Sequence, residues 1–299
     1  MKFLSFGLAA GALGILAGCA NYPGNVTALH PVIHTDPSLV DDTAPPAIRE
    51  LSFDSYGKRL NGLIYLANGP GPHPTVVLLH GYPGNEKNLD LAQSLRRVGY
   101  NVLFFHYRGA WGSEGEFSFE NVIDDVASSL DFLRDNAQAY RVDAEKLILI
   151  GHSMGGFAAL HGAANDPDVK CVAGIAPADL ARIPDFGKEA ASGFAIYSDT
   201  LQMLNGWTGE KAIKELTEKK ENLLLSPLGE KFSGKSVLLI AADKDTSVPP
   251  AMVTALATAY EANDETALKS ITLSGDHSFS WSRYALTDAI LDWIEPCGS

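Results

Sequence analysis

The sequence predicts an α/β fold, in which helices cover both faces of a mostly parallel β-sheet. Short continuous apolar runs, typical of strands that are buried on both faces, alternate with segments whose apolar residues recur at helical spacing. Repeated strand–helix units of this kind favour parallel strands joined by right-handed crossovers. The composition agrees with this class, because 46% of the 299 residues are hydrophobic, which is enough to bury a sizeable core.

The charge balance and the cysteine content exclude several other classes of protein. The formal net charge of −13 disfavours nucleic acid as a partner, because a sequence-independent nucleic-acid binder needs a basic surface. Three cysteines in a chain of this length cannot form a disulfide scaffold. Cys171 lies in an apolar run and is expected to be an inert core residue, although a bridge to Cys297 stays open.

Residues 1–18 are predicted to be a targeting segment rather than part of the fold. Lys2 precedes an apolar run that is short for a membrane-spanning helix and ends in small residues. The ending LAGC, with Cys19 last, resembles the cleavage box of bacterial lipoproteins. This resemblance implies that residues 1–18 are removed and that acyl chains such as palmitate on Cys19 hold the protein at a membrane of the bacterial cell envelope.

The residue after Cys19 is Ala20 rather than an aspartate, which implies the outer membrane in a host that has one. An ordinary signal peptide, with Cys19 incidental, would instead give a secreted or periplasmic protein.

Residues 19–47 are predicted to be a Pro-rich tether. The segment holds five prolines and no Lys or Arg, which favours an extended spacer. We therefore expect the body from Ile48 onward to fold without the residues before it. His30, His34 and Asp36 have loose metal-ligand spacing, but no second cluster completes a coordination shell, so we expect no metal site.

Eight strands are expected in the body, which covers residues 48–295. The first two alternate apolar and polar residues around Tyr56-Gly57-Lys58, which predicts an antiparallel hairpin at an edge of the sheet. Several later strands are continuous apolar runs, such as TVVLL and KLILI. The expected strands are 48–56, 58–66, 75–79, 101–106, 146–150, 169–175, 236–241 and 268–273.

Helical spacing of apolar residues predicts helices between these strands. The clearest is 118–136, where Ser118 can cap the helix and Glu120 in the first turn suits the helix dipole. Pro249 and Pro250 open a helix that runs to about residue 260. The other expected helices are 89–98, one that begins at Ser153, and 282–294.

Residues 178–235 interrupt the alternation of strands and helices. They place 58 residues between two strands, where a crossover needs about a dozen. Their helical patterns predict a cap insertion over the active site, the alternative being a surface excursion without function. Met203, Leu204 and Trp207 form an apolar cluster in this segment, which either lines an acyl pocket or packs the cap onto the body.

The motif G-x-S-x-G at residues 151–155 predicts a serine nucleophile. It follows the strand KLILI directly and begins a helix of small residues, which is the context that the motif requires. Ser153 would lie on a strained turn that lifts its hydroxyl above the sheet, where only glycine fits at Gly151 and Gly155. The N-terminus of the following helix would add a positive field for a developing oxyanion.

A serine nucleophile needs a base, and the expected partners follow it in the chain. Two histidines lie after Ser153. His161 is two helical turns along the same helix and cannot fold back, whereas His277 lies in a loop after the last strand. His277 is therefore the predicted general base.

The acid that orients the base is expected just after the strand at 236–241. Asp245, at the apex of that loop, is the first choice. Asp243, which is expected to make a structural turn contact, and Asp179, which follows the preceding strand, stay open as alternatives. Asp276 is adjacent to the base in sequence and is expected to point away from it.

Two glycine-containing loops are expected to shape the site. In HGYPG, at residues 80–84, the N–H of Tyr82 is expected to complete the oxyanion hole with the N–H of Met154. The phenol of Tyr82 is also a candidate for substrate contact. The second loop, at 108–115, begins with Arg108, which either contacts substrate or makes a structural ion pair.

Residues 229–236 match the phosphate-loop pattern G-x-x-x-x-G-K-S. A phosphate loop must follow a strand and open a helix, whereas this match precedes a strand. We therefore expect no nucleotide and no other cofactor.

Taken together, the motifs resemble the α/β-hydrolase superfamily over residues 48–295. HGYPG, YRGAWGSEG, GHSMGG, DTSVP and GDHSF fall in the order of that superfamily. The resemblance implies an α/β-hydrolase fold with an eight-stranded, mostly parallel sheet and a helical cap. It also implies a catalytic triad of Ser153, Asp245 and His277, with oxyanion donors at Tyr82 and Met154.

Within this superfamily, the residue at Ser153 separates several groups. Epoxide hydrolases use an aspartate nucleophile there, and dienelactone hydrolases use a cysteine. The body also resembles the catalytic domain of the prolyl oligopeptidase family, whose large N-terminal propeller cannot fit in so short a tether. We therefore expect a serine hydrolase that cleaves small-molecule carboxylic esters, a carboxylesterase. The alternatives are a peptidase or amidase with the same triad and a catalytically inactive binding module of the envelope.

Overall fold

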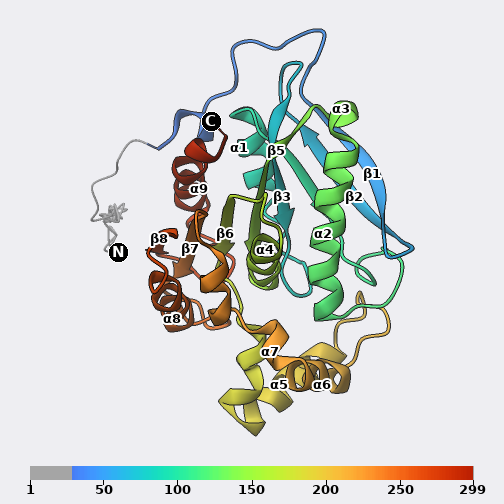
Figure 1. The fold of residues 1–299 in the computed structure, drawn as a ribbon, viewed down its shortest axis with the longest axis vertical. Helices are drawn as coiled ribbons and strands as arrows, with labels where there is room; N and C mark the ends of the chain where they lie inside the picture. Colours follow the sequence, from blue (N-terminus) through green and yellow to red (C-terminus); the bar gives the residue numbers. More distant parts are fainter. Residues whose placement is uncertain (1–28, 299) are drawn as a thin grey trace, which may run out of the picture.

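An eight-stranded sheet runs through the molecule in the order β1-β2-β4-β3-β5-β6-β7-β8 (Figure 1). The computed structural model describes residues 29–298. β2 is antiparallel to both of its neighbours, β1 and β4, and every other neighbouring pair is parallel. The strands are β1 (Ala47–Ser55), β2 (Lys58–Leu66), β3 (His73–Leu79), β4 (Asn101–Phe105), β5 (Val142–His152), β6 (Cys171–Ile175), β7 (Ser236–Ala242) and β8 (Ala267–Leu273). The mostly parallel sheet and its antiparallel edge hairpin are confirmed.

Helices cover both faces of the sheet, and each face has its own apolar core. Helices α1 (Leu89–Arg97) and α9 (Arg283–Gly298) pack on one face. Helices α2 (Phe119–Asp135), α3 (Ala137–Tyr140), α4 (Met154–Asn165) and α8 (Pro250–Glu261) pack on the other. Ser118 caps α2 as predicted, because its hydroxyl accepts the N–H of Asn121 at 3.0 Å.

The central strands divide their side chains between the two cores. Val77 and Leu79 of β3 enter one core, whereas Val76 and Leu78 enter the other. This alternation follows from the two-residue period of a strand, and it requires apolar residues at every position of a strand that is covered on both faces. The continuous apolar runs in the sequence therefore mark the strands that fix the position of the loops at the carboxyl edge of the sheet.

A helical cap lies between β6 and β7, as predicted. We call residues 178–235 the cap; Figure 1 shows its helices together below the sheet. It consists of η2 (Leu180–Phe186), α5 (Lys188–Asp199), α6 (Gly209–Glu218), α7 (Lys220–Leu223) and η3 (Ser226–Lys231). Trp207 joins it to the body, because its indole packs edge-on against the rings of Phe117 and Phe119, at centroid distances of 5.1 and 5.2 Å.

Cys171 of β6 and Cys297 of α9 form a disulfide. Their Cα atoms are 6.1 Å apart, although 126 residues separate them in the sequence. Cys171 is buried in the core, as expected, but its sulfur is bonded rather than free, so the bridge that the sequence left open is present. The packing of α9 across the sheet brings the two thiols together, and no local pattern around either cysteine encodes that packing.

The segment before β1, expected to be an extended spacer, contacts the body at several points of its described part. The N–H of His30 donates to Asp288 of α9 at 2.7 Å, and η1 (Pro31–Ile33) packs Val32 and Ile33 against the core of that face. Arg141 donates to the carbonyl oxygen of Ala44 at 2.9 Å. The predicted signal segment and Cys19 lie outside the described residues.

The part of the chain that the structure describes holds neither a membrane-spanning helix nor a metal-binding cluster. Between residues 29 and 298 no helix has the length and apolar character that crossing a membrane requires. The same residues hold no group of three His, Cys, Asp or Glu side chains that could bind a metal ion.

A shortened chain tests the contacts of this N-terminal segment. A chain that begins at Ala47 should be about 2–4 kcal/mol less stable than one that begins at Leu29, because it loses apolar burial and several hydrogen bonds. Urea denaturation of the two proteins measures the difference. Equal stabilities would restore the interpretation of this segment as a spacer.

Candidate active site

Ser153 lies at the junction of β5 and α4, in a backbone conformation that side chains rarely adopt. Its φ is 57° and its ψ is −119°. Its N–H donates to the carbonyl oxygen of Ile175 at 2.9 Å, and its own carbonyl oxygen accepts the N–H of Ala178 at 3.1 Å. Two bonds to β6 and the chain after it therefore hold the strained turn in place.

The glycines of the motif are required by close backbone approach, as predicted. A Cβ atom at Gly151 would overlap the carbonyl oxygen of Gly155, and one at Gly155 would overlap the carbonyl oxygen of Leu79. The loop after β3 also passes against the serine, since a Cβ at Gly81 would lie 3.0 Å from the Cβ of Ser153. The turn that presents Ser153 is thus in contact with the loop that carries Tyr82.

His277 and Asp245 form a hydrogen-bonded pair. The Nδ1 of His277 lies 2.6 Å from the Oδ2 of Asp245. The other carboxylate oxygen of Asp245 accepts the N–H groups of Ser247 and Val248, each at 2.8 Å. The Asp245 side chain is fully buried, whereas that of His277 is 24% exposed. Because the carboxylate is held by two backbone donors, it fixes the orientation of the imidazole ring.

The other acids near the predicted base, the two open alternatives Asp243 and Asp179 together with Asp276, contact different groups. Asp243 accepts the N–H of Gly275 at 3.0 Å, which lowers its pKa and ties the loop after β7 to the loop that carries His277. Asp276 accepts the N–H of Ser280 at 2.8 Å, and this bond lowers its pKa. Asp179 accepts the N–H of Leu225 at 3.3 Å. The Nδ1 of His277 is occupied by Asp245.

His152 is a residue of the site that sequence reasoning missed. Its Nε2 lies 2.7 Å from the carbonyl oxygen of His277, so this nitrogen must carry the proton and donate it. The two rings also contact each other, with centroids 4.7 Å apart. Burial lowers the pKa of His152 to about 3, which keeps its ring neutral. The signal was available, because a histidine occupies the first variable position of the G-x-S-x-G motif.

Tyr82 links the loop after β3 to the cap. Its hydroxyl donates to Ser198 of α5 at 2.8 Å and accepts the indole N–H of Trp207 at 2.7 Å. Its ring stacks on that of Phe194, with centroids 5.5 Å apart. Burial raises the pKa of Tyr82 to about 12. The cap thus holds the phenol of Tyr82, while the backbone of Tyr82 lies in the predicted oxyanion loop. Met154, the other predicted oxyanion donor, is the first residue of α4.

A pair of histidines holds this loop from the side of the sheet. The Nδ1 of His80 donates to the carbonyl oxygen of Gly81 at 2.8 Å, which leaves its Nε2 to accept from the Nδ1 of His106 at 3.2 Å. Burial lowers the pKa of His80 to about 3 and that of His106 to about 4, so both rings stay neutral.

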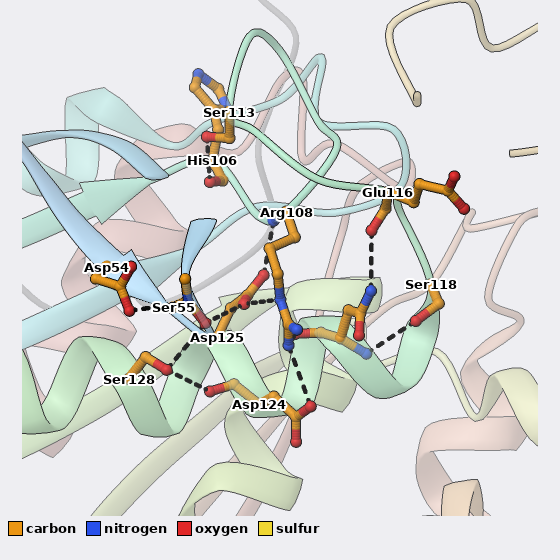
Figure 2. A network of polar contacts seen from close by, with 12 residues as sticks. Asp54, Ser55, His106, Arg108, Ser113, Glu116, Ser118, Asp124, Asp125 and Ser128 are labelled. Atoms are coloured by element: carbon orange, nitrogen blue, oxygen red, sulfur yellow. Dashed lines mark hydrogen bonds and ion pairs between the residues drawn. The ribbon is translucent and has the colours of Figure 1, made fainter. Parts of the chain in front are cut away.

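Arg108 makes a structural ion-pair network. Figure 2 shows its guanidinium above α2, directed at Asp124 and Asp125. Its Nε lies 2.5 Å from Asp125, which also accepts the backbone N–H of Arg108 at 2.7 Å and the hydroxyl of Ser55 at 2.6 Å. For Arg108 the sequence left open a substrate contact or a structural ion pair, and these contacts match the structural ion pair.

Ser153 and His277 open on one cavity of about 910 Å³ between the body and the cap. Most of its lining is apolar, and Asp179 is the one carboxylate among the described residues that line it. The apolar lining residues include Leu180, Ile183, Phe186, Phe194, Val248 and Met252. Neither Trp207 nor His161 belongs to the lining; His161 is buried in α4, with its Nε2 3.4 Å from the carbonyl oxygen of Leu223.

Replacing Trp207 by alanine tests its role in packing the cap. The free energy of unfolding should fall by about 3–5 kcal/mol, because the buried indole leaves a cavity between cap and body. The relative rates on esters of different acyl length should keep their profile, since Trp207 does not line the cavity. A changed profile at unchanged stability would instead favour the acyl-pocket interpretation.

Comparison with known proteins adds a family and several relatives. Residues 70–227, just over half of the chain, match the family model described as "Serine aminopeptidase, S33". The chain is 39% identical over 83 residues to the uncharacterized protein YfhR of Salmonella typhimurium. That match covers 27% of this chain and 27% of YfhR, so the chain spans about a quarter of the length of that relative.

Two solved structures share the fold over most of the chain. Est1E from Butyrivibrio proteoclasticus, which has also been solved with ferulic acid bound, superposes with a TM-score of 0.66 at 19% identity and covers 83% of this chain and 98% of its own. The acylaminoacyl peptidase of Pyrococcus horikoshii has a TM-score of 0.66 at 16% identity, over 85% of this chain and 42% of its own.

Proposed function

The chain belongs to the serine aminopeptidase S33 family of hydrolases and has the α/β-hydrolase fold, and on that premise we propose that it is a serine hydrolase that cleaves carboxylic esters. One observation carries the proposal. The hydrogen-bonded pair of His277 and Asp245 and the strained turn of Ser153 border the same cavity, at the carboxyl edge of the sheet. This is the arrangement in which a base can activate a serine hydroxyl toward a bound acyl group.

In the proposed reaction, the Oγ of Ser153 attacks the carbonyl carbon of the ester while the Nε2 of His277 takes its proton. Asp245 keeps the Nδ1 of His277 protonated and stabilises the imidazolium that forms. The N–H groups of Tyr82 and Met154 hold the negative charge that develops on the carbonyl oxygen. The imidazolium then protonates the leaving alcohol. Water, activated by the same base, hydrolyses the acyl-enzyme and restores Ser153.

Two features support a carboxylic ester with apolar groups as the substrate. The cavity beside Ser153 has a mostly apolar lining, and Asp179 is the one carboxylate among its described lining residues, so it disfavours a substrate that carries a carboxylate or a phosphate. Among the structures with this fold, Est1E has been solved with ferulic acid, a carboxylic acid that carries an aromatic ring.

A peptidase is the second candidate, because the family model is described as an aminopeptidase and the acylaminoacyl peptidase shares the fold. Matched substrates separate the two activities: each chromogenic ester is paired with the anilide of the same acyl group. We expect kcat/KM to be higher on the ester of every pair by more than the intrinsic difference in reactivity. A higher value on the anilides would assign the chain to the peptidases.

We further propose that acyl chains on Cys19 anchor the enzyme to a membrane of the bacterial envelope. Each buried CH₂ of such a chain contributes about 0.8 kcal/mol to membrane binding. Cys19→Ser should therefore lose the fatty-acid label and leave the membrane fraction, because the thioether forms on sulfur. Metabolic labelling with a fatty acid in a bacterial host measures this. Unlabelled wild type in a host that processes lipoproteins would contradict the anchor.

A further inference from the structure

Asp179 is a buried carboxylate of the cavity that the proposed mechanism does not use. It lies in the chain after β6, is 8% exposed and lines the cavity together with Ser153. The backbone that carries Asp179 also contacts the nucleophile: the N–H of the preceding residue, Ala178, donates to the carbonyl oxygen of Ser153 at 3.1 Å. Since Asp245 already holds His277, Asp179 is not needed as the acid of a triad.

The carboxylate of Asp179 has little to compensate its charge. One oxygen accepts the N–H of Leu225 over a long 3.3 Å. Within residues 29–298 no side chain donates a hydrogen bond to Asp179. The two basic groups whose charges reach it pair with Asp185 instead: the Nζ of Lys220 at 2.5 Å and the Nε of Arg182 at 4.0 Å.

Burial raises the pKa of Asp179 to about 6, so this carboxyl group is still ionised in most molecules at neutral pH. A buried charge without a partner is costly, and proteins normally pair it or neutralise it. No Lys or Arg lies among the described residues that line the cavity, so the protein does not supply that partner there. A bound molecule can supply it.

We propose that Asp179 binds a protonated amine of the substrate, so that the site prefers esters that carry an ammonium group near the scissile bond. An ammonium group would donate charge-assisted hydrogen bonds to the carboxylate oxygen that has no partner, while the remainder of the substrate contacts the apolar lining. This inference rests on the proposed function for its chemistry, but the recognition of the amine can be measured separately from turnover.

The ammonium group could belong to the acyl part or to the alcohol part of the ester, and two series of substrates distinguish them. The first series runs from glycyl to ε-aminocaproyl esters, and each member is compared with the ester that has a methyl group in place of the ammonium. The second compares an ethanolamine ester with the propyl ester of the same acid. The members of each pair have nearly the same shape, but the ammonium group also raises the intrinsic reactivity of the ester. The ratio of the two kcat/KM values is therefore divided by the ratio of the non-enzymatic hydrolysis rates, and this corrected ratio measures recognition of the amine.

Two variants complete the test. Asp179→Asn keeps an oxygen that can accept the N–H of Leu225 but removes the charge. Glu189→Gln removes an exposed charge of α5 that does not line the cavity, as the matched control. We expect wild type to prefer the ammonium member of at least one pair by roughly 10- to 100-fold. That preference should fall to near unity in Asp179→Asn and persist in Glu189→Gln.

A binding measurement keeps this result distinct from a failure of the proposed function. Calorimetric titration of the Ser153→Ala protein with the ammonium and methyl members of each pair reads recognition without turnover. If no ester is hydrolysed but the ammonium members bind more tightly, the esterase proposal fails and the assignment of Asp179 stands. Equal binding and a corrected ratio near unity within every pair, or a preference that survives in Asp179→Asn, would overturn the assignment.

Discussion

Ser153→Ala is expected to lower ester turnover by roughly four to six orders of magnitude, because the substitution removes the atom to which the acyl group would be transferred. Folding should be affected little, since only a hydroxyl is lost and alanine accepts the same backbone conformation about as well as serine does. The free energy of unfolding should therefore change by about 1 kcal/mol or less. Turnover of a chromogenic ester and urea denaturation of the same preparation measure both quantities.

Ser129→Ala is a suitable control for this variant. Ser129 is also a buried serine, but it lies on α2 and its hydroxyl donates to the carbonyl oxygen of Val126 at 2.7 Å. This control should keep its turnover. Ester turnover that is undiminished in Ser153→Ala would contradict the assignment of the nucleophile.

His277→Ala should lose turnover to a similar extent, because it removes the proposed base of Ser153. Asp245→Asn should lose less, about 10⁴-fold, since it leaves the base in place but no longer holds it in the correct protonation state. Steady-state kinetics on one ester compares the two variants. A matched histidine is available as the control, because His161 is buried in α4 and lies outside the cavity.

His161→Gln is expected to keep its turnover per folded molecule, although the loss of ring packing against Phe157 should lower its stability. Thermal denaturation of each variant separates loss of fold from loss of chemistry. Turnover that survives in His277→Ala and disappears in His161→Gln would overturn the choice of base.

The sequence was sufficient to predict those parts of the fold that depend on local patterns. The apolar runs of β3 and β7 and the Ser118 cap of α2 are visible in a few neighbouring residues. Boundaries were less well predicted where polar residues extend a strand: β5 begins at Val142, whereas its apolar run begins near residue 146. The disulfide between Cys171 and Cys297 was left open, since it depends on how α9 crosses the sheet.

In the candidate site, too, the features that local motifs encode were predicted, and the contacts between distant segments were not. The order of motifs predicted that Ser153, Asp245 and His277 belong together, because the fold places the ends of neighbouring strands side by side. Sequence alone did not indicate that Tyr82 is bound to Ser198 and Trp207, or that His152 donates to the backbone of His277. These contacts join segments that are far apart in the chain, and each depends on the exact direction of one polar group.

Covalent labelling tests the central claim most directly. Wild-type protein is treated with a fluorophosphonate, and the mass of the intact protein and of its peptides locates the adduct. The account predicts one adduct per chain on the Oγ of Ser153, and no adduct in Ser153→Ala. An unlabelled wild type, as expected of a binding module without activity, or an adduct on another residue would contradict it.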